Sequence, residues 1–225
     1  MLPLRDINPR RRIPFITYGL IIFNVGIFIW TQFYTAAELE DLFLRLSIVP
    51  VNISENPIAI ETILDISRSM FFHGGWLHLL GNMLYLWLFG DNVEDRMGVV
   101  LYLILYILSG FAAATTQILI DPDSRIPLIG ASGAIGGILG AYLLLFPGVR
   151  VQGVIPLGRF SGVSTWPAWA VLGLWFLLQL GYAVFSVFPG NGASGGVAFF
   201  AHVGGFVFGM IYTWIFMRLV PQAPA

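Results

Sequence analysis

Six apolar stretches, each about 20 residues long, constrain this chain more than any other feature of its sequence. A helix of about 20 residues crosses the hydrocarbon core of a bilayer, which is about 30 Å thick. Only 10% of the 225 residues are charged and the mean hydropathy is +0.83, so a soluble core could not bury the apolar surface. We therefore predict an all-α, polytopic membrane protein. The expected spans lie near Ile13–Phe33, Phe71–Gly90, Gly98–Ile120, Leu128–Pro147, Trp166–Phe188 and Phe199–Val220.

The chain is expected to form one membrane domain over residues 1–225. Residues 1–12 form a short basic tail, and residues 34–70 form a long first loop. Apolar residues recur in that loop at the spacing of one helical face, as at Leu39, Leu42 and Phe43. Short amphipathic helices lying in the outer interface of the membrane are predicted there.

Arginine is the only basic residue besides histidine, and its distribution between loops indicates orientation. With the N-terminus in the cytoplasm, eight arginines fall on the cytoplasmic side and three on the far side, which predicts cytoplasmic termini. The eight are Arg5, Arg10, Arg11, Arg12, Arg96, Arg150, Arg159 and Arg218, and the three are Arg45, Arg68 and Arg125. A signal peptide is an alternative for the first stretch, although the apolar run is long for one. A bacterial inner membrane is the default expectation, and an organellar membrane stays open.

Four of the polar residues inside the expected spans are candidates for function, because burying such residues in a membrane is costly. Ser132, His202, His78 and Asn82 belong to spans that all enter from the outer face. Ser132 and His202 are expected about 5–6 Å below the starts of their helices, with His78 and Asn82 deeper. A hydroxyl that meets an imidazole at that depth has the geometry of an activated serine nucleophile.

Glycines accompany both residues and permit close helix packing. Gly133, Gly136 and Gly140 follow Ser132, and Gly205 and Gly209 follow His202 on one helical face. Glycines at this spacing let two helix backbones approach in lipid. Taken alone, these glycines indicate packing and nothing more.

The start of the Ser132 helix is also a candidate oxyanion site. Backbone N–H groups there lack intrahelical partners and could hold a developing oxyanion. His78 and Asn82 stand four residues apart on one face and could donate to the same oxygen, although a lone buried Asn is more often a helix–helix hydrogen bond. No carboxylate lies near His202 in sequence, so a Ser–His dyad is expected rather than a triad.

Composition excludes other classes of function. The net charge of −1 suggests no nucleic-acid partner, and the absence of cysteine excludes thiol chemistry. Only three histidines are present, with no carboxylate or thiolate at their depth, so no metal site and no cofactor are expected.

Three motifs in order resemble the rhomboid family of intramembrane serine proteases. They are the segment from His73 to Glu94, Gly130-Ala-Ser-Gly, and Ala201-His-Val-Gly-Gly. The resemblance implies a six-helix bundle in which Ser132 is the nucleophile and His202 the base. It also implies an oxyanion hole of His78, Asn82 and the Ser132 backbone, and a Gly-rich cap at 189–196.

The implied activity is endopeptidase cleavage of transmembrane segments of other membrane proteins near their outer end. The alternatives are a non-catalytic relative that binds transmembrane helices for quality control, and a small transporter, whose inverted repeats and midplane charges are not found. Two features depart from the family. Residues 34–70 contain no Trp-Arg pair, and Gly136 stands where some members place a tyrosine against the histidine.

Overall fold

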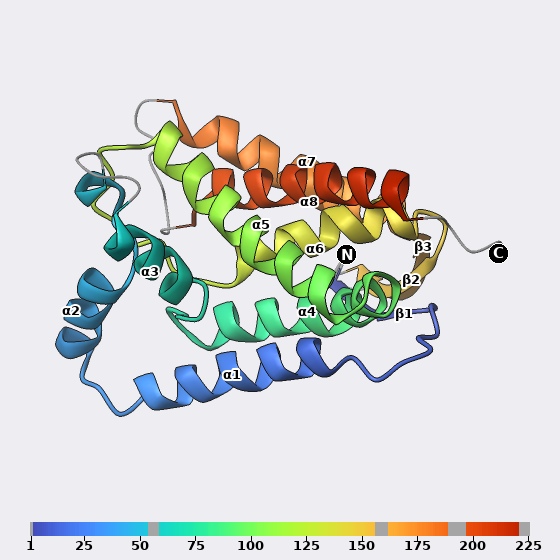
Figure 1. The fold of residues 1–225 in the computed structure, drawn as a ribbon, viewed down its shortest axis with the longest axis horizontal. Helices are drawn as coiled ribbons and strands as arrows, with labels where there is room; N and C mark the ends of the chain where they lie inside the picture. Colours follow the sequence, from blue (N-terminus) through green and yellow to red (C-terminus); the bar gives the residue numbers. More distant parts are fainter. Residues whose placement is uncertain (1, 54–58, 156–161, 189–196, 221–225) are drawn as a thin grey trace.

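The computed structural model describes residues 2–53, 59–155, 162–188 and 197–220. Within these ranges six long helices pack side by side in a bundle (Figure 1). The helices are α1 (Phe15–Thr31), α4 (Trp76–Met97), α5 (Val99–Ile120), α6 (Ser132–Leu145), α7 (Ala168–Ser186) and α8 (Phe199–Leu219).

Helix α6 is the centre of the bundle. Every residue from Gly133 to Tyr142 is buried, and α6 packs most closely against α8. A Cβ atom added to Gly205 would come within 2.0 Å of the Gly133 carbonyl oxygen, and one added to Gly140 within 2.2 Å of the Phe206 carbonyl oxygen. The two helices therefore meet backbone to backbone.

Three of the described helices, α5, α7 and α8, are long and apolar enough to cross a membrane. Helices α1 and α6 are apolar but shorter, with 17 and 14 residues. At 1.5 Å per residue α6 is about 21 Å long, less than the hydrocarbon core of about 30 Å. The number of spans, six, stays a prediction.

Helix α4 continues past the expected end of the second span. The acidic residues at 91–96 belong to the last turns of α4. The prediction of a turn between two spans at 91–96 is therefore wrong. Burial with partners explains the difference: the Glu94 carboxylate accepts from the backbone N–H groups of Ile16 and Thr17, at 2.9 and 2.7 Å. Glu94 thereby satisfies donors at the start of α1 that have no intrahelical partner.

A three-stranded antiparallel sheet shows that the expectation of a purely helical chain is wrong in part. Strands β1 (Leu2–Asp6), β2 (Arg150–Ile155) and β3 (Gly162–Pro167) pair in the order β1-β2-β3. Residues 2–6 of the expected tail are thus an edge strand. Pro3 is compatible with this position because an edge strand tolerates a missing N–H, and the register shifts between Pro3 and Arg5.

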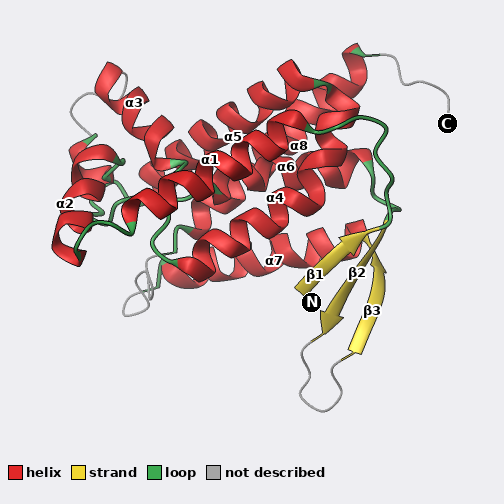
Figure 2. Ribbon diagram, turned by 90° about the horizontal axis from the view of Figure 1, so that it is seen from below, coloured by secondary structure: helices red, strands yellow, loops and turns green. Residues whose placement is uncertain are grey.

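The first loop holds the two short helices that its apolar periodicity predicted, α2 (Ala36–Leu46) and α3 (Ile60–Ser69). Between them lies a 3-10 helix, η1 (Pro50–Asn52), which was not predicted. Helix α2 begins with a capping box in which Thr35 and Glu38 satisfy each other's backbone N–H groups. These helices lie at one end of the bundle and the sheet lies at the other (Figures 1 and 2).

Candidate active site

Ser132 is the first residue of α6, not four residues into it as expected. Ala131 is the N-cap and provides no side-chain hydrogen bond. The first intrahelical bond here runs from the Ile135 N–H to the Ala131 carbonyl, at 2.9 Å. The N–H groups of the residues between them therefore have no partner within the helix.

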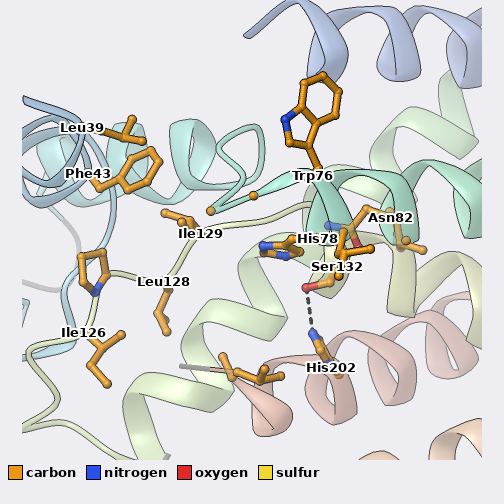
Figure 3. Close-up of a pocket in the computed structure, with 18 of the residues that line it drawn as sticks. Leu39, Phe43, Trp76, His78, Asn82, Ile126, Leu128, Ile129, Ser132 and His202 are labelled. Atoms are coloured by element: carbon orange, nitrogen blue, oxygen red, sulfur yellow. Dashed lines mark hydrogen bonds between the residues drawn. The ribbon is translucent and has the colours of Figure 1, made fainter. Parts of the chain in front are cut away.

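The structure brings Ser132 and His202 together although 70 residues separate them. His202 lies in the first turn of α8, which begins at Phe199 as expected. The Ser132 Oγ lies 2.8 Å from His202 Nε2 and is placed to donate its proton to that nitrogen (Figure 3). The close packing of α6 on α8 makes this distance possible.

A cavity of about 1180 Å³ opens in front of these two side chains. Ser132, His202, His78 and Asn82 all line it. Much of the remaining wall is apolar and comes from α2, the start of α4 and the segment before α6, as Figure 3 shows. Its labelled members are Leu39, Phe43, Trp76, Ile126, Leu128 and Ile129.

His78 lies in the first turn of α4 and points toward Ser132 (Figure 3). Because α4 begins at Trp76 and not at Phe71, His78 lies two residues from the start of its helix and not seven residues into it. Gly130 leaves room for the His78 ring. Its φ is +125°, and a Cβ at this position would come within 2.6 Å of His78 Nε2. Only glycine combines this backbone conformation with this contact.

Asn82 is buried and bonds to His73. Its side-chain nitrogen donates to His73 Nε2 at 3.0 Å, and this partner precedes α4 and does not belong to a neighbouring helix. An amide nitrogen carries two hydrogens, so one remains for the cavity that Asn82 also lines. The ring of His73 in turn meets that of His78 edge to face, with centroids 5.1 Å apart.

The glycines expected at the helix contact lie there, with one difference. Gly136, Gly140, Gly205 and Gly209 face the backbone of the opposite helix in the α6–α8 pair. The absent side chain of Gly133 instead faces α5, because its Cβ would come within 2.4 Å of the Ala113 Cβ.

Two side chains of α7 that the sequence reasoning missed contact His202. The Gln179 Oε1 lies 2.7 Å from His202 Nδ1, and the Trp175 ring centroid lies 6.2 Å from the imidazole centroid. An amide alone in an apolar helix was the available signal for Gln179. The Gly-rich segment 189–196 and Arg159, for which expectations were stated, lie outside the described residues.

Comparison with known proteins identifies the family. The profile of the Rhomboid domain matches residues 61–219, which is more than half of the chain. The chain belongs to the rhomboid family. It is therefore an integral membrane protein, and its motifs from His73 to Gly209 fall within the matched rhomboid domain.

Three relatives illustrate how far the similarity to other rhomboids extends. The chain is 28% identical to Rhomboid protein 1, mitochondrial, of Saccharomyces cerevisiae, over 71% of this chain and 43% of that protein. It is 31% identical to RHOMBOID-like protein 1 of Arabidopsis thaliana, over 66% and 33%. It is 24% identical to Rhomboid-like protein 11, chloroplastic, of the same plant, over 89% and 65%.

The matched region covers less than two thirds of each of these relatives. The compartments in their names are the mitochondrion and the chloroplast. The comparisons therefore give no support to the expected bacterial inner membrane.

Proposed function

We propose that this rhomboid is an intramembrane serine endopeptidase that cleaves transmembrane segments of other membrane proteins. The observation that carries the proposal is the 2.8 Å contact between the Ser132 hydroxyl and His202 Nε2 inside the cavity. A nucleophile within hydrogen-bond reach of a base is the arrangement that covalent acyl transfer requires.

In the proposed first half-reaction, Ser132 Oγ attacks the scissile carbonyl carbon while its proton passes to His202 Nε2. The tetrahedral intermediate collapses as its C–N bond breaks, and His202 returns the proton to the leaving amine. The products are an acyl ester on Ser132 and a free amine. In the second half-reaction, water gives a proton to His202 and attacks the ester, and Ser132 regains its hydrogen as the carboxylic acid leaves.

The oxyanion of each tetrahedral intermediate would lie at the start of α6. Backbone N–H groups of its first turn, His78 and the free amide hydrogen of Asn82 are the proposed donors. Donors already in place stabilise developing charge without reorganisation, and one such donor is worth about 10²- to 10³-fold in rate.

The apolar wall of the cavity supports a transmembrane segment as the substrate. Leu39, Phe43 and Trp76 would contact apolar side chains next to the scissile bond. We further propose six spans with both termini on the cytoplasmic side. Helix α6 can be shorter than the bilayer because neighbouring helices surround it, and its starting residue Ser132 would then lie below the outer surface.

The proposal is tested with detergent-purified protein and a tagged single-pass membrane protein as substrate. Wild type is expected to cleave it, and Ser132→Ala is expected to be inactive. A fluorophosphonate is expected to label Ser132 in wild type and to fail in His202→Ala. Equal cleavage by wild type and Ser132→Ala would contradict the mechanism, and a wild type that binds the substrate without cleaving it would favour a non-catalytic role.

A further inference from the structure

Gln179 is an isolated amide in a helix otherwise composed almost entirely of apolar residues. Helix α7 has the sequence AWAVLGLWFLLQLGYAVFS over Ala168–Ser186, and it is one of the described helices able to cross a membrane. An amide placed in such a helix is costly unless it is hydrogen-bonded. Gln179 avoids that cost by facing the cavity, where it meets His202.

The bond between these residues determines which nitrogen of the imidazole carries the proton. The Gln179 Oε1 is a carbonyl oxygen and can only accept, and it lies 2.7 Å from His202 Nδ1. Nδ1 must therefore donate, so the hydrogen is on Nδ1 and the Nε2 lone pair is free. That lone pair faces the Ser132 Oγ at 2.8 Å, which is the arrangement in which His202 can remove a proton.

We infer that Gln179 is a positioning residue that fixes the tautomer and the orientation of His202. It occupies the place relative to the imidazole that a carboxylate occupies in a serine–histidine–aspartate triad. A neutral amide provides the acceptor without burying a charge in a membrane segment, which is costly. The catalytic consequence of the inference rests on the proposed function, whereas the tautomer does not.

Other contacts leave this task to Gln179. Trp175 is one turn before Gln179 on the same helix, and its ring is tilted 32° from the imidazole plane. Trp175 limits sideways movement of the ring but does not select a nitrogen. Gly136, one turn after Ser132 on α6, has no side chain to cover the ring, and a Cβ there would come within 3.0 Å of the His202 carbonyl oxygen.

The test compares Gln179→Met with Gln117→Met. Methionine keeps the length of glutamine and removes the acceptor. Gln117 is a matched control because its Oε1 accepts from the backbone N–H of Ala201, at 3.3 Å, and not from the imidazole. Both changes replace an amide beside the start of α8 with the same side chain.

The first measurement is nitrogen NMR of the protein with ¹⁵N-labelled histidine in detergent. The chain has three histidines, and the His202 signals are assigned by their loss in His202→Ala. Wild type and Gln117→Met are expected to show His202 with a protonated Nδ1 and a bare Nε2. Gln179→Met is expected to lose this preference. A wild-type His202 protonated at Nε2, or an unchanged pattern in Gln179→Met, would overturn the inference.

The second measurement is cleavage of the tagged substrate. Gln179→Met is expected to lower kcat by about 10²-fold with little change in KM, because a displaced catalytic group costs about that much. Gln179→Glu keeps the acceptor and is expected to retain activity. Its added negative charge favours the protonated imidazole, so the acidic limb of its pH–rate profile moves to higher pH.

These two measurements separate this inference from the proposed function. Protein that never cleaves, yet shows His202 protonated at Nδ1 in a Gln179-dependent way, overturns the protease and supports the positioning contact. Cleavage that is unaffected by Gln179→Met supports the protease and overturns the positioning role.

Discussion

Gly209 of α8 lies so close to Gly137 of α6 that a Cβ on Gly209 would come within 2.0 Å of the Gly137 carbonyl oxygen. One turn earlier, Gly205 stands in the same relation to Gly133. Gly133 follows Ser132 directly, and Gly205 follows His202 by three residues. The distance between the hydroxyl and the imidazole is therefore set by contacts between backbones.

Gly209→Ala is expected to destabilise the protein and to separate Ser132 from His202. The new methyl group meets a backbone carbonyl that cannot rotate away, and such overpacking costs about 1–3 kcal/mol. The measurements are the melting temperature in detergent and the extent of fluorophosphonate labelling of Ser132. Both are expected to be lower than in wild type.

Gly181→Ala is the matched control for this change. Gly181 is also a helical glycine, but a Cβ there meets nothing within 4 Å. Alanine is the better helix former by about 1 kcal/mol, so the melting temperature is expected to stay the same or rise. Equal destabilisation by the two alanines would show that the α6–α8 contact is not the cause.

Gly130→Ala is expected to lower kcat by about 10²- to 10³-fold, as for loss of one oxyanion donor. A Cβ at this position would come within 2.6 Å of His78 Nε2, so the His78 ring must leave its place beside Ser132. Gly74→Ala is the control, because a Cβ on Gly74 makes only an ordinary contact of 3.5 Å with Ile129. A Gly130→Ala enzyme with the wild-type rate would argue against a catalytic role for His78.

Glu94→Ala is expected to lower the free energy of unfolding by about 1–3 kcal/mol for each buried donor left without a partner. The lost carboxylate accepts from the backbone N–H groups of Ile16 and Thr17 and from the Thr17 hydroxyl. Asp95→Ala removes a neighbouring carboxylate whose bond to the Arg11 N–H is exposed, and a small effect is expected. Chemical or thermal unfolding measures the stability of both variants. Similar losses of stability in the two would contradict the capping of α1 by Glu94.

Asp6→Asn is expected to change how stability depends on pH. Burial raises the pKa of Asp6 to about 6 from 3.8, so the folded protein holds this proton more tightly than the unfolded chain. The contribution of Asp6 to stability is therefore full below pH 3.8 and declines as pH rises toward about 6.

The measurement is the melting temperature of wild type and Asp6→Asn between about pH 4 and about pH 7. Relative to the asparagine variant, wild type is expected to be more stable at the acidic end than at the neutral end. Groups common to both proteins cancel in the comparison. A difference between the two melting temperatures that does not vary with pH would refute the effect.

Long apolar runs and paired motifs made most of the helical part of this fold predictable. The bounds of α5 and α8 agree with expectation to within one residue, since each helix is apolar over most of its length. The end of α4 was not predictable in this way, because Glu94 and Asp91 read as a polar turn until α1 and Arg10 supply their partners. The strands are short, and Pro3 and Gly153 interrupt their patterns.

The candidate site shows the same division. Ser132 and His202 could be paired from the sequence because each opens a glycine-rich helix entering from one side. Gln179 belongs to no recognisable motif. Its importance depends on the orientation of α7 about its own axis, which places the side chain against His202 Nδ1. A contact of that kind is determined by tertiary packing, and the hydrophobic periodicity of the sequence does not predict it.

The amino-terminal strand has one more consequence. Because β1 pairs with β2 along one side, it shields a row of backbone donors and acceptors that would otherwise be open to another molecule. Without residues 1–6 the open edge would be β2, which lacks the proline and the register shift that make the β1 edge a poor template for intermolecular strand addition. We therefore expect the protein, once extracted from its membrane, to aggregate more readily when those residues are removed.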